Sequence, residues 1–284
     1  SYIFSELKSP WSFKMNTPNI ACFHIVLSGK AWLRLEEDET AILLKAGELA
    51  ILPLGASHFM YASHSDKLMA IDIQELINSY PKQPRFFKAG GQGETTEMIC
   101  GYFKFDMSLA RPLLQSLPPI LHIPNENGYM RDWLSIGIHF IISETKQQRA
   151  AHQAIVNRIC DLLFIECMRE YVESLDLNSD SWLSALKDPY LARTLSAIHR
   201  YPASAWSLES LAKESGLSRS ALAARFSQHL NQGIMEYLTA YRMRLVSWWL
   251  RSSSLTLAQI AEKVGYSSEA ALSQAFKREL GYSP

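Results

Sequence analysis

The chain contains one motif twice, and this repeat limits what its last third can fold into. The motif "LAKESGLSRSALAARFSQHL" occupies residues 211–230, and "IAEKVGYSSEAALSQAFKREL" occupies residues 260–280. In each copy a helical segment leads into a glycine turn, a serine stands where a helix N-cap is expected, and a second helical segment follows. A small alanine four residues before the glycine allows the two helices to pack closely. We therefore expect two helix-turn-helix units, joined by a helix over residues 234–251.

The charge of the chain is divided between its two parts. The formal net charge is zero, yet residues 183–284 carry 12 Lys and Arg against 7 Asp and Glu, so the preceding part is acidic. A basic C-terminal third indicates a polyanionic partner such as DNA, although a solvated surface has a similar composition.

The first 120 or so residues have the pattern of short strands. The apolar run "IACFHIVL", the turn "SGK" and the alternating "AWLRLE" predict a hairpin, and similar strands follow at regular spacing, which is typical of an antiparallel barrel or sandwich. After Pro118 and Pro119 the apolar spacing changes to three and four, which predicts two helices over residues 130–175 with a break near Thr145. The predicted fold class is α+β with two domains: an antiparallel β-barrel with following helices in 1–178, and an all-α tandem helix-turn-helix in 179–284.

Several function classes are disfavoured by what the sequence lacks. No apolar run approaches the roughly 18 residues of a membrane span, and "SYIFSELKSPWSF" has no signal-peptide pattern. Four scattered cysteines are too few for a disulfide framework, so we expect thiols. A cytoplasmic protein with no membrane partner is therefore expected.

The predicted helix over 149–175 is apolar on more than one side, which favours a homodimer.

The tandem motif resembles the AraC/XylS family of transcription regulators over about residues 189–284. The resemblance implies two helix-turn-helix subdomains that enter adjacent major grooves of double-stranded DNA. The family motif continues beyond the final "SP" with a Tyr-Arg segment, so the sequence is expected to stop short of the motif's end. The residues that the resemblance places at DNA are Arg219, Ser220, Ala221, Ala223, Ala224 and Arg225 in the first unit, Arg244 in the joining helix, and Ser268, Glu269, Ala270, Ser273, Gln274, Lys277 and Arg278 in the second unit.

Two of these positions carry a more specific expectation. Gln274 is the best base reader, because a glutamine side chain pairs with adenine in the major groove. Ala224 stands where many relatives have arginine and cannot donate a hydrogen bond, so readout by the first unit would depend on Arg219, thymine methyl groups or DNA shape. Arg225 and Arg244 are candidates for phosphate contacts.

The segment "AGELAILPLGASH" over residues 46–58 resembles the second cupin motif, and "CFHIVLSGKAWLRL" resembles the sensor domain of a cupin-bearing branch of the AraC family. Metal-binding cupins use His-x-His, a glutamate and a later histidine. Here Cys22 and His24 take the first pair and His58 the later position, while the glutamate is missing. These three residues, with Cys100, are candidates for effector or redox sensing, and the first three also for zinc. The alternative is that the metal site has been lost and the side chains simply fill the barrel. No cofactor is required.

The main hypothesis is a DNA-binding transcriptional regulator whose cupin-like domain senses a small effector or an oxidant. Family precedent favours an activator, with RNA polymerase as a further partner. One alternative is a metal-dependent cupin enzyme with a helical accessory domain, although the missing glutamate argues against an enzyme. The other alternative is a regulator that acts through protein partners without DNA.

Overall fold

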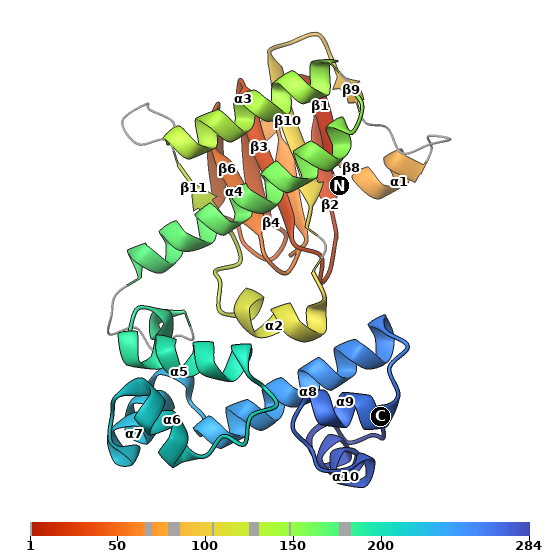
Figure 1. Cartoon of the computed structure of the whole chain (residues 1–284). Helices are drawn as coiled ribbons and strands as arrows, with labels where there is room; N and C mark the ends of the chain where they lie inside the picture. Colours follow the sequence, from red (N-terminus) through yellow and green to blue (C-terminus); the bar gives the residue numbers. More distant parts are fainter. Residues whose placement is uncertain are drawn as a thin grey trace. The chain divides into compact units, whose positions relative to one another are not determined.

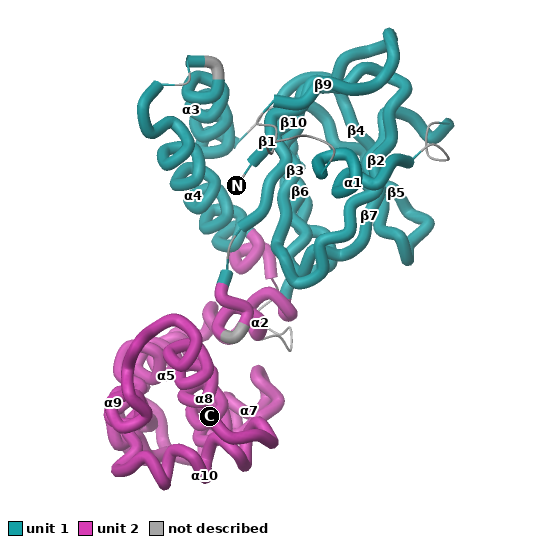
Figure 2. The backbone as a smooth tube through the Cα atoms, turned by 90° about the vertical axis from the view of Figure 1, so that its right-hand side faces the viewer, with its two compact units in different colours: residues 1–105, 117–170 teal, residues 106–116, 171–284 magenta. Residues whose placement is uncertain are grey.

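The alternating strands and the helical repeat fold into separate parts of the chain. A computed structural model describes residues 2–65, 70–78, 86–103, 105–124, 131–147, 149–175 and 183–284. The chain forms two compact units, residues 1–105 with 117–170 and residues 106–116 with 171–284 (Figure 2). The predicted linker at 175–182 lies outside the described residues except for Leu175, so the predicted domain boundary at 178 stays a prediction.

The strands of the first unit form two sheets. The first sheet has the order β11 (Leu121–Ile123), β6 (Leu49–Leu52), β3 (Cys22–Ser28), β10 (Thr95–Tyr102), β1 (Tyr2–Lys8) and β9 (Phe86–Gly90). The second has the order β5 (Ala41–Lys45), β4 (Lys30–Leu35), β7 (His58–Tyr61), β2 (Ser12–Met15) and β8 (Ile71–Asp72).

The predicted α+β fold class is confirmed, but the predicted antiparallel β-barrel needs correction. Among the described residues no strand pairs with both sheets, so the arrangement is a sandwich. Two of the strand pairs, β1 with β9 and β2 with β8, are parallel. The closing pairs of a barrel join strands that are distant in sequence, and alternation within a strand does not report them.

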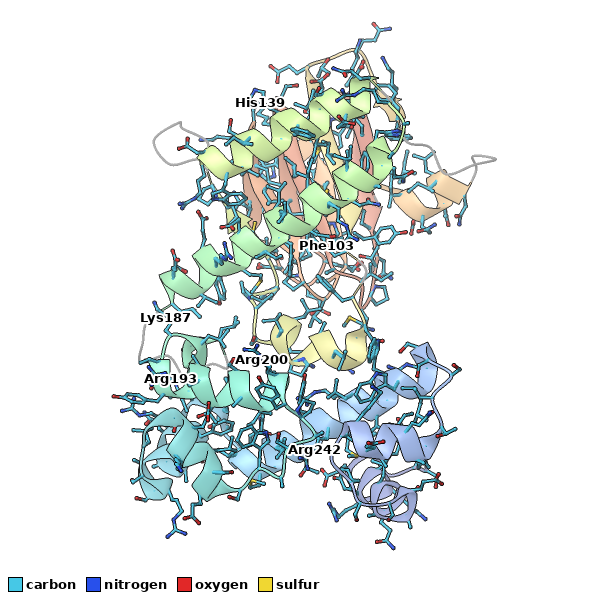
Figure 3. The ribbon with its side chains drawn as sticks, in the orientation of Figure 1. Phe103, His139, Lys187, Arg193, Arg200 and Arg242 are labelled. Atoms are coloured by element: carbon cyan, nitrogen blue, oxygen red, sulfur yellow. The ribbon has the colours of Figure 1, made fainter. Side chains whose placement is uncertain are left out.

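The core of this unit lies between the sheets because each strand turns every second residue inward. Cys22 and Val26 of β3 belong to the buried cluster shared by both sheets. Phe23 is buried outside that cluster and packs on Phe103, which in turn contacts Phe164 of α4 (Figure 3). Helices α3 (Asp132–Gln147) and α4 (His152–Ser174) therefore cover the outer face of the first sheet, and the short helix α1 (Ile73–Asn78) follows β8 (Figure 1). The predicted break between the two long helices is real, but α3 continues past Thr145 to Gln147.

The second unit is helical and contains both copies of the motif. Its helices are α2 (Met107–Gln115), α5 (Pro189–Arg200), α6 (Leu208–Ser215), α7 (Arg219–Leu230), α8 (Ile234–Ser252), α9 (Leu257–Lys263) and α10 (Glu269–Leu280). Ser218 and Ser268 cap α7 and α10, each accepting a hydrogen bond from the backbone N–H three residues later. The turn glycines Gly216 and Gly265 both have positive φ. The tandem helix-turn-helix prediction is confirmed.

Helix α8 belongs to the cores of both helix-turn-helix units. Tyr237 and Leu238 lie in the core of the first unit, and Met243 and Val246 in the core of the second. Tyr241 packs against both cores. A single rigid helix thus fixes the spacing between the two units.

Arg242 of α8 adds a polar connection between the two helix-turn-helix units (Figure 3). Its guanidinium donates hydrogen bonds of 2.8 Å to the carbonyls of Pro202 and Ser204, in the loop between α5 and α6. The same group lies over the ring of Tyr266, next to the turn of the second helix-turn-helix unit.

Among the described residues, no helix is long and apolar enough to cross a membrane.

Candidate functional site

The outer face of α7 carries the residues of the first helix-turn-helix unit that are expected to meet DNA. The apolar side chains Leu222 and Phe226 are fully buried, which turns the opposite side of the helix outward. The exposed residues there include Arg219, Ser220, Ala221 and Ala224, while Ala223 is half-buried. Arg219 makes no ion pair with any described residue, so its guanidinium is available to a ligand.

Arg225 is exposed but already has a protein partner. Its Nη1 donates to Asp188 at 2.6 Å, and the guanidinium lies over the ring of Tyr190. Asp188 also caps α5 by accepting from two backbone N–H groups. Partial burial acts to raise the pKa of its carboxyl, but the hydrogen bond from Arg225 and those from the two backbone N–H groups together hold this pKa below the usual value. Arg225 therefore supports the fold, and its predicted phosphate contact stays a prediction.

Arg244 is half-buried and lies over the rings of Tyr237 and Tyr241, 5.8 Å from each centroid. Burial lowers the pKa of this guanidinium, and the neighbouring tyrosines act in the opposite direction. The side chain is part of the packing around α8, which accounts for an arginine there without any DNA contact.

The outer face of α10 is the more polar of the two. Leu272, Ala275 and Phe276 are buried, which leaves the expected DNA-facing residues on the other side. Among these residues Glu269, Ala270, Gln274, Lys277 and Arg278 are exposed and Ser273 is half-buried. Ser268 is occupied in capping the helix.

Two exposed polar residues at the end of α7 were not predicted. Ser227 and Gln228 are exposed, and the 50-residue offset between the second helices of the repeat makes them the equivalents of Lys277 and Arg278. That offset was the available signal.

In the β-sandwich unit, residues 1–105 with 117–170, a cavity of about 320 Å³ is lined by the four residues expected to sense a signal. Cys22 and His24 enter it from β3, Cys100 from the neighbouring β10, and His58 from β7 of the other sheet. Apolar side chains line the rest of the cavity together with a few polar groups; they include Ile3, Met15, Ile73, Ile77, Tyr102 and Gln153.

Three of these four residues meet closely. The ligand atoms of Cys22, His24 and His58 all lie within 4.8 Å of one another, and all three residues are buried. Cys100 lines the same cavity but is outside this group.

The hydrogen bonds of the two histidines fix their tautomers. His58 Nδ1 lies 2.7 Å from the carbonyl oxygen of Ala56, which can only accept, so this nitrogen carries the proton. His24 Nε2 lies 2.9 Å from His58 Nε2 and must therefore donate to it. His24 Nδ1 then has a lone pair and no hydrogen-bond partner among the described residues.

Burial keeps the whole cluster uncharged. It lowers the pKa of His58 to about 4 and lowers the pKa of His24 well below its usual value. Burial also raises the pKa of the Cys22 thiol to about 11 and of the Cys100 thiol to about 12. All four cysteines of the chain are thiols, as expected.

The first unit also exposes apolar side chains along α3 and α4. A groove there is lined by Ile136, Phe140 and Ile155, among others. Ile136 is 69% exposed and Leu162 is 61% exposed. The prediction that the second long helix has apolar residues beyond its core face is confirmed.

Comparison with known proteins agrees with both halves of this description. Residues 1–173 match the Cupin family, and residues 211–284 match the family described as a helix-turn-helix domain.

Relatives match over almost the whole chain. It is 34% identical to the HTH-type transcriptional regulator AlkR of Acinetobacter baylyi, over 100% of this chain and 92% of that protein. It is 32% identical to an AraC-like transcription regulator of Streptomyces lividans, over 96% of this chain and 88% of that protein. Among solved structures, the DNA-binding domain of AdpA in complex with a target DNA is 25% identical, with a TM-score of 0.32, over 34% of this chain and 86% of that one.

Proposed function

This chain belongs to the AraC-type transcriptional regulators with an N-terminal cupin domain, and we propose that a molecule bound in its sandwich cavity controls how its two helix-turn-helix units bind a promoter. It is a DNA-binding regulator rather than an enzyme. The observation that carries the proposal is the cavity between the sheets, in which apolar walls surround a buried pair of neutral histidines. Such a cavity is typical of small-molecule sites, where apolar walls supply area and a few polar groups fix orientation.

The proposed DNA contacts are made by the outer faces of α7 and α10. A helix of this kind places its first turns in the major groove, and the shared helix α8 would hold the two at a fixed separation. Gln274 is the proposed base reader on α10, and Arg219 is its counterpart on α7 because its charge is not paired within the described part of the protein.

The proposed signal is a small molecule with an apolar body and one polar group. The adjoining smaller cavity, which shares Ile3, Met15 and Cys100, extends the apolar wall. Polar recognition would come from His24, whose Nδ1 has no hydrogen-bond partner among the described residues. An oxidant acting on Cys22 or Cys100 is less favoured, because a thiol with a raised pKa holds little of the reactive thiolate.

The regulator is proposed to act as a cytoplasmic homodimer and, from family precedent, as an activator that contacts RNA polymerase. The exposed apolar residues of α3 and α4 support self-association, since a patch of this kind is unfavourable in water. Leu162→Glu should shift the protein toward monomer in sedimentation, whereas Ile71→Glu, which also replaces an exposed apolar residue, should leave the association unchanged.

The control of DNA binding is tested by filling the cavity. Ile3→Trp places a large side chain in it, far along the chain from either recognition helix. A compound that raises the melting temperature of the wild type should also change its affinity for a promoter duplex, and it should do neither to a folded Ile3→Trp variant. A compound that stabilises the wild type through the cavity without changing DNA affinity would contradict the proposal.

A further inference from the structure

The cluster of Cys22, His24 and His58 brings three side chains that can bind a metal into one buried place. Its three donor atoms converge within 4.8 Å in a buried place, and they come from both sheets. The two histidines are joined by one hydrogen bond, between His24 Nε2 and His58 Nε2, so the two nitrogens face each other inside the cluster.

A second observation concerns His58 alone. Its Nδ1–H donates to the carbonyl of Ala56 at 2.7 Å, which fixes the ring and directs the Nε2 lone pair at the cluster. A metal-bound histidine almost always donates its other ring N–H to a carbonyl or carboxylate in this way. This hydrogen bond therefore already orients one ligand.

The distances are close to those of a bound ion. In a tetrahedral site with metal–nitrogen bonds of about 2.0–2.1 Å, two histidine nitrogens lie about 3.3 Å apart. The Nε2 atoms of His24 and His58 are 2.9 Å apart, so a shift of a few tenths of an ångström would admit an ion between them.

The chemistry of the donors selects the ion. One thiolate with two imidazoles suits zinc and monovalent copper, while calcium and magnesium require oxygen ligands. We propose that Cys22, His24 and His58 bind one thiophilic metal ion, Zn²⁺ or Cu⁺, between the two sheets, with the remaining coordination position open to the cavity. The inference deepens the proposed function, since an effector with a donor atom would occupy that open position.

The protons balance as follows when an ion enters. The thiol of Cys22 releases its proton to solvent and becomes the thiolate ligand. His24 keeps a single proton but carries it on Nδ1, so that Nε2 can bind the ion, and His58 is unchanged. One proton is released for each ion bound. The charge of the site is neutral with Cu⁺ and +1 with Zn²⁺, so zinc would favour an anionic fourth ligand from the effector or from Cys100.

Equilibrium dialysis of the full chain against Zn²⁺, and separately against Cu⁺ under reducing conditions, tests the site. We expect one bound ion per wild-type chain, and we expect Cys22→Ser or His58→Gln to reduce the number of ions bound per chain at least tenfold. The matched controls are Cys160→Ser, a buried thiol of α4 outside the cluster, and His122→Gln, which pairs with Glu48. Both controls should bind like the wild type, and the two dialysis arms identify the ion.

Co²⁺ serves as a spectroscopic probe, because a thiolate–cobalt bond gives a charge-transfer absorption that Cys22→Ser should abolish. Circular dichroism establishes that each variant is folded, and a cluster variant that unfolds is replaced by the milder His24→Gln. Binding of less than a tenth of an ion per folded wild-type chain, or equal binding by wild type and folded cluster variants, would overturn the inference. The proposed function fails separately, if cavity ligands leave the DNA affinity of the wild type unchanged both with and without the metal ion.

Discussion

Gly265 lies against Ala203, so that a Cβ at Gly265 would come within 2.3 Å of the carbonyl oxygen of Ala203. Gly265 forms the turn of the second helix-turn-helix, and Ala203 belongs to the loop between α5 and α6 of the first. The same loop accepts the hydrogen bonds of Arg242. The two helix-turn-helix units are therefore in contact at a second place besides their shared helix α8.

The equivalent glycines of the repeat should respond differently to the same substitution. Gly216 has a φ of +79° and open space within 4 Å of where a Cβ would stand, whereas Gly265 has a φ of +77° and is crowded by Ala203. Gly216→Ala should lower the free energy of unfolding by about 1 kcal/mol through left-handed backbone strain. Gly265→Ala should cost about 2–4 kcal/mol, because the carbonyl must also move. Urea unfolding of both variants measures the difference, and equal losses would contradict the contact.

Gln274→Ala should weaken discrimination at one base step of the operator. Loss of a bidentate contact to adenine costs about 1–3 kcal/mol at that position and little elsewhere. Binding to a series of duplexes with single base changes measures the effect, with Gln147→Ala, an exposed glutamine of α3, as the control. An equal loss on every duplex would remove Gln274 as a base reader.

Arg219→Ala and Arg225→Ala should separate DNA contact from fold support. Arg219 has no ion-pair partner among the described residues, so its loss should weaken DNA binding without changing the free energy of unfolding. If Arg219 meets phosphate, the slope of log affinity against log salt should fall by about 1. Arg225 pairs with Asp188, so its loss should lower the free energy of unfolding of the helical unit, residues 106–116 with 171–284. The reverse pattern would show that the roles have been exchanged.

Arg244→Gln should weaken binding to about the same extent on all DNA sequences, because the side chain packs on α8, which holds both helix-turn-helix units. The side chain packs on Tyr237 and Tyr241, so the substitution should also lower the free energy of unfolding by about 1 kcal/mol. Parallel urea unfolding and DNA titration test this, and a loss confined to one base step would contradict it.

His199 should make the second unit less stable as the pH falls. Burial lowers its pKa to about 4, and its Nε2 lies 2.7 Å from the hydroxyl of Tyr237. The unfolded chain therefore binds one more proton between about pH 6.5 and 4, and stability falls across that window as the pH is lowered. From pH 7 to 5 the wild type should lose about 2 kcal/mol more than His199→Gln, as chemical unfolding at each pH would report. A constant difference between the two proteins would place the titration elsewhere.

The helical half could be predicted because its signals are local. The caps Ser218 and Ser268 and the turns at Gly216 and Gly265 lie within a few residues of the helices that they delimit. Partners distant in sequence could not be predicted. Nothing in the local pattern pairs Arg225 with Asp188, 37 residues away.

The cluster of Cys22, His24 and His58 was predicted in part for the same reason. Alternation along β3 places Cys22 and His24 on one face of the strand, and the cupin resemblance added His58. The 2.9 Å contact between the histidines depends on how the two sheets face each other, which no single strand specifies. The position of Cys100 outside the close group depends on the register of β10 against β3, which pairs Cys100 with His24.

Selection of bound sequences from a pool of random DNA duplexes tests the central claim most directly. Two helix-turn-helix units fixed on α8 should enrich two short elements about 10 base pairs apart, one helical turn of DNA. Gln274→Ala should lose base preference in one element only, and Arg219→Ala should weaken the other. Enrichment of a single element, or of two elements at variable spacing, would contradict the account.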